Sequence, residues 1–396
     1  MATQYSKYFI FLAAVILLAG CGGSSGPFKA TTVALCGDTQ VRAVFADDFN
    51  GDGADDIAAG CRTRHDPLKG HVEIWLSDGS GGMHKAQSLP LGSFKTGGEG
   101  AGPITAADFN EDGNPDLVIT DTGGTTHGIS LLYGKGDGTF GQPTYYKRSA
   151  INAVATSDVN GDGHQDMLPI VSGFGSGASH YIPGDGSRLD AGARMQLVAH
   201  DTRGYKDASF GDFNGDRATD VVIPEPRAGR LHVFTSGGKA HDIVLGKAVR
   251  QVQRVLSGAD VDGDGKTDLL VATRRQDGGN DTRWLLTKGG PHLSAPLSAV
   301  PTDATRVRAA DFNGDGVTDL LVGQGYKPKL KYHGGAHPLI LIGKQDGGFK
   351  KPIKLDLPGS PGGEVLADLN GDGKTDFVYQ RISDKDPQGA VYLSTM

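Results

Sequence analysis

The sequence predicts an all-β protein built from seven copies of one repeat, arranged as a single closed array. A nine-residue pattern, read most clearly at Asp368–Asp376 (DLNGDGKTD), occurs seven times. The chain also contains 62 glycines and only 7% aromatic residues, as is typical of a turn-rich β protein. No sustained helical periodicity follows residue 20, which agrees with the same fold class.

The spacing of the copies defines the repeat. They begin at Asp48, Asp108, Asp158, Asp212, Asp260, Asp311 and Asp368. Successive starts lie 60, 50, 54, 48, 51 and 57 residues apart, a period typical of stacked supersecondary units. Length alone would suggest two or three domains, but the repeat predicts one array over residues 28–396.

Each copy carries oxygen donors at positions 1, 3, 5 and 9, whereas position 7 varies freely, as expected of a residue that contributes only its backbone carbonyl. Hard oxygen ligands at alternate positions of a tight loop suit Ca²⁺. The sequence therefore predicts up to seven calcium ions. Their predicted ligands are Asp48, Asn50, Asp52, Ala54, Asp56; Asp108, Asn110, Asp112, Asn114, Asp116; Asp158, Asn160, Asp162, His164, Asp166; Asp212, Asn214, Asp216, Ala218, Asp220; Asp260, Asp262, Asp264, Lys266, Asp268; Asp311, Asn313, Asp315, Val317, Asp319; and Asp368, Asn370, Asp372, Lys374, Asp376.

Two other interpretations of the pattern fit the sequence less well. An EF-hand requires an acidic residue at position 12 and an exiting helix, but position 12 is never acidic here and position 9 leads into β-type runs such as Asp319–Val322. Solvated Asp/Asn/Gly turns are common as single copies, and seven copies with the same donors favour a metal. Position 6 is Gly in six copies, where the loop should need a positive φ. Arg217 occupies it in the fourth copy, which we expect to be the weakest site.

The pattern D-x-[DN]-x-D-G-x-x-D at this spacing resembles the FG-GAP/VCBS repeat of integrin α-chain propellers and bacterial surface proteins. The resemblance covers residues 28–396. It implies that each repeat is a four-stranded propeller blade whose calcium loop joins the first two strands. It implies less about function, because that family includes adhesins, receptors and accessory domains of enzymes.

The two ends of the chain complement each other. After the seventh pattern only two strands are predicted, Phe377–Ile382 and Ala390–Ser394, so the last blade lacks its fourth strand. Before the first pattern lies an unassigned β-like run, Lys29–Leu35. Placing this run on the outer edge of the last blade closes the ring. The predicted fold is a seven-bladed β-propeller with calcium-binding loops, closed by an N-terminal strand in the last blade.

Residues 1–20 are expected to be a lipoprotein signal peptide. Lys7 supplies its positive end, and the apolar run Tyr8–Leu18 is too short to span a bilayer comfortably. The segment ends in Leu18–Cys21 (LAGC), which resembles a bacterial lipobox with Cys21 as the lipidated residue. Residues 21–27 would form a flexible tether. We expect an exported protein anchored by lipid to the bacterial cell envelope, at the outer membrane or cell surface; an ordinary secretory signal with an incidental Cys is the alternative.

Cys36 and Cys61 are the remaining cysteines. Cys36 ends the closing strand and Cys61 ends the second strand of the first blade, so both should lie near the ring junction. In an exported chain we expect them to form a disulfide. Two reduced core cysteines are the alternative.

The net charge of −7 reflects the repeats, whose donor positions supply 22 of the 46 acidic residues. Removing the signal would lose Lys7 and give −8. Seven divalent ions would then bring the surface to about +6. The chain contains no basic run, so nucleic acid is not an expected partner, and a membrane is expected only through the lipid anchor.

A partner is expected on the face opposite the calcium loops. The connections there vary most, at residues 62–71, 121–128, 274–281 and 323–337. Loops on a rigid scaffold commonly carry function, and cationic groups beside Tyr favour anionic or sugar ligands. The candidate ligand-binding residues are Arg62, Arg64, His65, Arg274, Arg275, Tyr326, Tyr332 and His333; solvated loop charge is the alternative for each.

No catalytic residues are predicted. The G-x-S-x-G match at residues 22–26 lies in the tether rather than between a strand and a helix. The sequence favours a calcium-binding, lipid-anchored propeller that acts as a binding, adhesion or protein-interaction module with a protein or glycan ligand. The alternative is a polysaccharide-active, lyase-like enzyme or a glycan-binding accessory protein. An enzyme would need an acid/base pair such as His65 or Tyr332 with an Arg.

Overall fold

The structure is a computed structural model. It describes residues 27–37, 39–62, 70–91, 101–121, 127–148, 151–171, 179–189, 195–198, 209–216, 218–225, 229–235, 239–301, 304–324, 338–345, 348–355, 361–381 and 389–396. The predicted signal peptide, most of the predicted tether, Cys21 and Arg217 lie outside these ranges. The described residues form strands and turns but no helix, so they include no helix that could cross a membrane.

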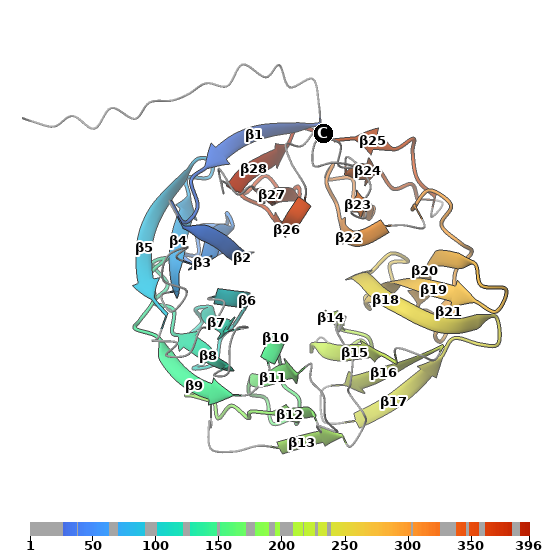
Figure 1. Cartoon of the computed structure of the whole chain (residues 1–396), viewed down its shortest axis with the longest axis horizontal. Coiled ribbons are helices and arrows are strands. Elements are labelled where there is room, and N and C mark those ends of the chain that lie inside the picture. Colours follow the sequence, from blue (N-terminus) through green and yellow to red (C-terminus); the bar gives the residue numbers. More distant parts are fainter. Residues whose placement is uncertain are drawn as a thin grey trace, which may run out of the picture.

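Six four-stranded antiparallel sheets surround a central axis as the blades of a β-propeller (Figure 1). The first two comprise β2 (Gln40–Asp47), β3 (Asp56–Arg62), β4 (Gly70–Ser77), β5 (Met83–Pro90) and β6 (Ala101–Ala107), β7 (Asp116–Asp121), β8 (His127–Leu132), β9 (Thr144–Arg148). The next two comprise β14 (Ser209–Gly211), β15 (Asp220–Pro224), β16 (Arg230–Thr235), β17 (Lys239–Val244) and β18 (Val249–Ala259), β19 (Asp268–Arg275), β20 (Asn280–Leu286), β21 (His292–Leu293). The last two comprise β22 (Ala304–Ala310), β23 (Asp319–Gln324), β24 (Leu339–Leu341), β25 (Ile353–Lys354) and β26 (Pro361–Ala367), β27 (Asp376–Arg381), β28 (Gly389–Ser394) with β1 (Phe28–Val33).

Four further strands lie between the β6–β9 and β14–β17 blades (Figure 1). They are β10 (Ile151–Ser157), β11 (Asp166–Val171), β12 (Ser179–Tyr181) and β13 (Met195–Val198). They form two separate two-stranded sheets, β10–β11 and β12–β13. Met167 and Ile182 bridge the two sheets through a pair of backbone hydrogen bonds of 2.9 and 2.8 Å.

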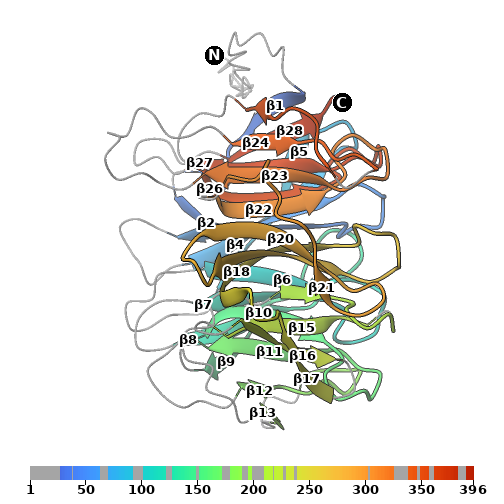
Figure 2. The same ribbon diagram turned by 90° about the vertical axis from the view of Figure 1, so that its right-hand side faces the viewer.

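The N-terminal strand joins the C-terminal sheet. β1 runs antiparallel to β28, from Phe28 opposite Ser394 to Val33 opposite Gly389, and the sheet order is β1-β28-β27-β26. The two views agree that β1 lies beside the end of the chain (Figures 1 and 2). The run expected as Lys29–Leu35 is thus a strand slightly earlier in the chain, and Leu35 is buried in the turn that follows.

Strand composition follows position in the blade. Strands β3 and β15 are buried almost throughout, because both faces of these central strands are covered, and they therefore read as continuous apolar runs. The outer strand β5 is mostly polar and exposed. Small residues end the innermost strands, as Ala107 ends β6 and Ala310 ends β22.

The hydrophobic core is divided into clusters between neighbouring blades. One cluster joins the β2–β5 and β6–β9 blades through Phe49, Val72 and Leu117. Within it, the rings of Phe49 and Phe140 meet edge to face with centroids 5.3 Å apart. A second cluster joins the first blade to the last through Ile57 and Leu369.

Candidate metal centres

Each nine-residue pattern forms a tight loop between the first and second strands of its sheet; we call these the acidic loops. In the first, the Asp48 carboxylate accepts the N–H of Gly51 (2.7 Å), Asp52 (3.2 Å) and Gly53 (3.0 Å). The same three bonds recur from Asp158 and from Asp311. Position 1 therefore organises the loop backbone around its own carboxylate.

Two positions of each acidic loop need a left-handed backbone. Position 6 has positive φ wherever it is described, for example 88° at Gly53. Position 4 has it as well, for example 74° at Gly51, and this second requirement was not predicted. Five of the other six loops also have Gly at position 4, whereas the second has Glu111 with a φ of 57°. A non-Gly residue in this region costs about 1–2 kcal/mol.

The Asp at position 9 fastens the loop to the sheet. All seven of these residues are fully buried: Asp56, Asp116, Asp166, Asp220, Asp268, Asp319 and Asp376. In Asp56, one carboxylate oxygen accepts the N–H of Phe49 (3.1 Å) and the other accepts that of Ser77 (2.9 Å) at the end of the third strand. Asp319 makes the equivalent bonds to Phe312 (3.1 Å) and Gly343 (2.7 Å).

Burial disfavours the ionised form of these carboxylates. Burial raises the pKa of Asp56, Asp116, Asp166, Asp319 and Asp376 to about 6, the backbone hydrogen bonds oppose this rise, and neighbouring loop carboxylates add to it. A divalent cation would stabilise the ionised form of the position 9 Asp and offset its repulsion from the neighbouring loop carboxylates.

The fifth acidic loop gives the most direct test of fit to a cation. One carboxylate oxygen from each of Asp260, Asp262 and Asp268 lies within 4.8 Å of the others. Asp262 Oδ1 is buried and has no hydrogen-bond partner among the described residues. A buried carboxylate oxygen without a partner is costly, and coordination to a cation would satisfy it. The donor set therefore fits a hard divalent ion.

Adjacent acidic loops also contact each other. The N–H of Asp55, at position 8 of the first loop, donates to the Asp368 carbonyl of the seventh (2.8 Å), and the Asp368 N–H donates to the Asp55 carboxylate (2.7 Å). Thr375 and Thr267 make the same backbone bond to the first Asp of the preceding loop, Asp311 (2.9 Å) and Asp212 (2.6 Å). Disturbing one loop should thus disturb its neighbour.

The raised pKa of the position 9 Asp residues should make the folding stability of calcium-free protein depend on pH. An acid with a folded-state pKa of about 6 and an unfolded value of 3.8 binds more protons when folded between these pH values. The stability of calcium-free protein should therefore rise as the pH falls from 7 to about 5. Urea unfolding in chelator at several pH values measures this, and a stability that falls steadily over that range would contradict it.

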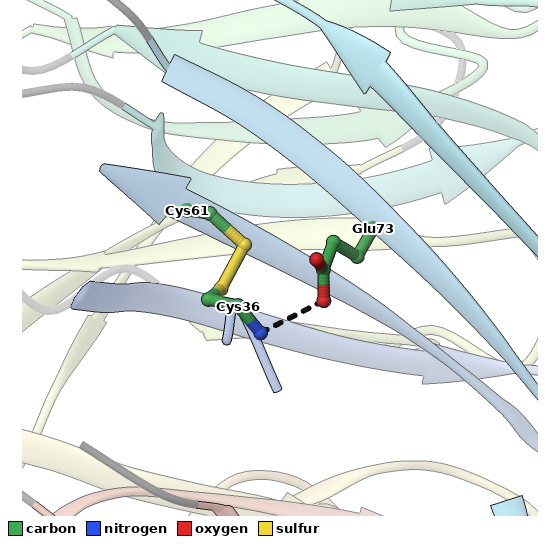
Figure 3. A group of neighbouring side chains, drawn as sticks. All are labelled: Cys36, Cys61 and Glu73. Carbon is green, nitrogen blue, oxygen red and sulfur yellow. Dashed lines mark hydrogen bonds between the residues drawn. A yellow bond between two sulfur atoms is a disulfide. The ribbon is translucent and has the colours of Figure 1, made fainter. Parts of the chain in front are cut away.

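Cys36 and Cys61 are joined by a disulfide, with their Cα atoms 5.5 Å apart (Figure 3). The bond ties the turn after β1 to the end of β3. Beside it lies Glu73 of β4, 3% exposed, whose carboxylate accepts the Cys36 N–H at 2.8 Å. Trp75 Nε1 (2.9 Å) and Lys85 Nζ (3.1 Å) donate to the same carboxylate.

Glu73 is a buried anion that the sequence reasoning missed. Burial would raise its pKa, but hydrogen bonds involving His71, Cys36, Lys85 and Trp75 outweigh that effect and lower it to about 2. The available signal was an acidic residue within the apolar strand HVEIWL. Because the unfolded value is 4.5, the stability that the ionised Glu73 adds is present above about pH 4.5 and is lost as the pH falls toward 2.

Replacing both cysteines (Cys36→Ala with Cys61→Ala) should lower stability by about 2–4 kcal/mol, because the bond closes a loop with a sequence separation of 25. Thermal unfolding followed by circular dichroism measures the change. An unaltered melting temperature would show that the pairing of β1 with β28 holds this segment without the covalent bond.

The predicted partner-binding residues are divided between described and undescribed parts of the chain. Arg62 ends β3 and Arg274 lies in β19, which continues to Arg275 where a variable loop was expected. Arg275 is bound to Asp277 (3.0 Å) and Asp281 (3.2 Å), so its charge is already balanced. The other five, Arg64, His65, Tyr326, Tyr332 and His333, lie outside the described residues.

Together, the six sheets and their acidic loops define a β-propeller with Asp/Asn-rich repeats. A family model described as the FG-GAP-like repeat matches residues 48–119, 108–168 and 260–322. Integrin alpha-4 of Xenopus laevis is 32% identical over 117 residues, which are 28% of this chain and 10% of the integrin. The chain thus matches about a tenth of the length of that curated relative. It is a β-propeller that contains FG-GAP-like repeats.

Two solved structures align with most of this chain. Virginiamycin B lyase from Staphylococcus aureus aligns with a TM-score of 0.50 and 11% identity, covering 92% of this chain and 99% of the lyase. The Vibrio cholerae biofilm matrix protein Bap1 aligns with a TM-score of 0.41 and 15% identity, covering 93% of this chain and 91% of Bap1. At 11% identity, the alignment with the lyase supports the fold alone. The alignment with Bap1, at a TM-score of 0.41, supports no conclusion about this chain.

Proposed function

We propose that this chain is a calcium-stabilised, lipid-anchored propeller of the bacterial envelope that binds a protein or glycan partner. The observation that carries the proposal is the repeated acidic loop, which has the same donors seven times and the same fully buried Asp at position 9. Such a scaffold holds its surface loops rigidly, as recognition requires.

The proposed propeller has seven blades. Its seventh blade consists of β10–β13, and the support for it is the Met167–Ile182 bridge between their two sheets together with their place in the ring (Figure 1). Closure of the ring is supported by the pairing of β1 with β28. Closure is also supported by the Asp55–Asp368 contacts and by the Ser77 hydroxyl, which donates to the Leu369 carbonyl at 2.5 Å.

Calcium is the proposed structural ion. Side chains at positions 1, 3, 5 and 9 and the carbonyl at position 7 would hold it, and it would neutralise the carboxylates that now add to the raised pKa of the position 9 Asp. Support comes from the partnerless Asp262 oxygen and the three converging carboxylates of the fifth loop. Because the ion would bind only the folded loop, its binding would add to folding stability.

Anchoring and location rest on the sequence. The charged end, short apolar run and Leu18–Cys21 segment support export and lipidation at Cys21. An oxidising compartment also agrees with the Cys36–Cys61 disulfide.

The binding role is supported by the fold class and by the likeness to an integrin α-chain. The enzymatic activity in the name of virginiamycin B lyase is not transferred, because 11% identity supports only the fold. The proposed partner surface includes Arg62 and Arg274, at the ends of β3 and β19 that lie away from the acidic loops.

Arrays of glycans and envelope or host proteins, probed with the purified protein in calcium, test this function. We expect saturable binding that is lost in chelator, without conversion of the bound material. Release of cleaved or unsaturated sugar from a panel of anionic glycans would instead support the polysaccharide-active alternative.

A further inference from the structure

Several junctions between blades are filled in the same way. The turn after the third strand of one blade supplies a large apolar side chain, which we call the plug, that packs with the second residue of the preceding acidic loop. Phe140 packs on Phe49 in this manner. The plugs Met83, Leu189 and Phe349 share clusters with Leu369, Phe109 and Val261, respectively.

Turn length decides whether a plug is present. The plug lies opposite, across the turn, the residue whose N–H donates to the position 9 carboxylate. In three blades the two are six residues apart: Ser77 with Met83, Gly134 with Phe140 and Gly343 with Phe349. In the β18–β21 blade, Thr287 donates to Asp268, but Leu286 already pairs with His292. The residue opposite Thr287 is therefore Pro291, only four residues later, and it is exposed.

A cavity of about 520 Å³ lies where this junction lacks its plug, between the β14–β17 and β18–β21 blades. Its apolar floor includes Val222, Val233, Leu269 and Leu285, and its rim includes His241, Lys266 and Thr287. Phe213, at position 2 of the fourth acidic loop, also lines it and is only partly buried, whereas its counterparts Phe49 and Phe312 are 2% and 0% exposed. The cavity is large enough for an aromatic or long aliphatic side chain.

Another junction of the same chain shows what Lys266 is placed to do. Its counterpart Lys374, at position 7 of the seventh loop, lies against Gly314 of the preceding loop as Lys266 lies against Gly215. The ammonium of Lys374 donates to the terminal main-chain oxygen of Met396 at 2.6 Å. The Met396 side chain packs into the cluster that contains Phe312. At that junction the Met396 side chain fills the space between the blades, and the Lys374 ammonium binds the main chain of Met396.

We propose that the cavity between the β14–β17 and β18–β21 blades binds a peptide segment of a partner protein. An aromatic or long aliphatic side chain of the partner fills the cavity, as Phe140 and Met396 fill theirs. The Lys266 ammonium donates a hydrogen bond to the backbone carbonyl of that residue, or to its carboxylate where the residue ends the partner chain. The site is separate from the surface of Arg62 and Arg274, so either proposal can fail alone.

The test uses acetylated pentapeptides copied from a natural plug, Gly136–Phe140 (GDGTF), as free acid and as amide, with GDGTG as the control. Saturation-transfer NMR with the purified full chain in calcium should detect both Phe peptides and not the Gly peptide. Lys266→Met should weaken binding at least about tenfold, because a hydrogen bond from a charged group is lost. Stronger binding of the acid than of the amide would identify a chain terminus as the natural ligand.

Two controls separate this site from non-specific binding. Lys288→Met removes an exposed neighbouring charge that contacts the Asp262 carbonyl and should leave binding unchanged. Exchanging Gly289–Pro291 for the residues of Gly136–Phe140 supplies a plug in cis, and should abolish peptide binding while keeping or raising the melting temperature. Absence of peptide binding to folded protein, or binding that survives both Lys266→Met and the exchange, would overturn the proposal.

Discussion

Chelation of calcium is expected to lower the melting temperature of the protein substantially. At a calcium concentration ten times Kd, each occupied site contributes about 1.4 kcal/mol, and several sites contribute together. Without the ion, the carboxylates of each acidic loop repel one another around a fully buried Asp. Thermal unfolding in EDTA and after calcium is restored measures the effect.

The stabilisation should depend on calcium concentration and be absent with a monovalent salt of equal ionic strength. That control matters because added salt alone also screens repulsion between carboxylates. A melting temperature that is the same with and without chelator would mean that hydrogen bonds alone hold the acidic loops.

Asp319→Ala is expected to be far more damaging than Asp315→Ala, although both are proposed ligands in one loop. Removing the Asp319 carboxylate leaves the N–H groups of Phe312 and Gly343 buried without acceptors, at a cost of about 3–5 kcal/mol. Asp315 is exposed and accepts the Val317 N–H at 2.9 Å, so its loss should mainly remove one ion, about 1–2 kcal/mol.

Urea unfolding of the two variants, with calcium and with chelator, separates the roles. In chelator, Asp315→Ala should unfold close to the unaltered protein, whereas Asp319→Ala should remain strongly destabilised. Equal effects of the two substitutions under both conditions would refute the assignment of position 9 as the residue that fastens loop to sheet.

The repeat made most of the fold predictable. Because each acidic pattern begins where one strand ends and leads into an apolar run, strand order and blade boundaries follow from it, and the leftover run near Lys29 correctly suggested a strand beside β28. The connection at Arg274–Asp281 was predicted less well: a loop was expected, but β19 and β20 extend to a tight turn closed by the N–H of Arg275, which donates to the Gly279 carbonyl at 2.8 Å. Gly278 supplies the positive φ of 86° that this turn needs.

Features of the site that depend on contacts between distant segments were not predictable. Donor spacing identified the loop carboxylates, but of the two backbone N–H groups that bind Asp56 only that of Phe49 lies in the same loop, and that of Ser77 comes from the end of the third strand. Glu73 accepts the Cys36 N–H only when the turn at Cys36 packs on β4. The cavity beside Lys266 lies at a turn that is two residues shorter than its counterparts in three other blades, and this difference appears only from the strand register.

The calcium content of the purified protein tests the central claim most directly. Elemental analysis of protein equilibrated in dilute calcium and passed through a desalting column should find several calcium ions per chain, approaching seven, and almost none after substitution of all position 1 and position 5 aspartates by Asn. A folded, unaltered protein that retains no calcium under these conditions would contradict the account.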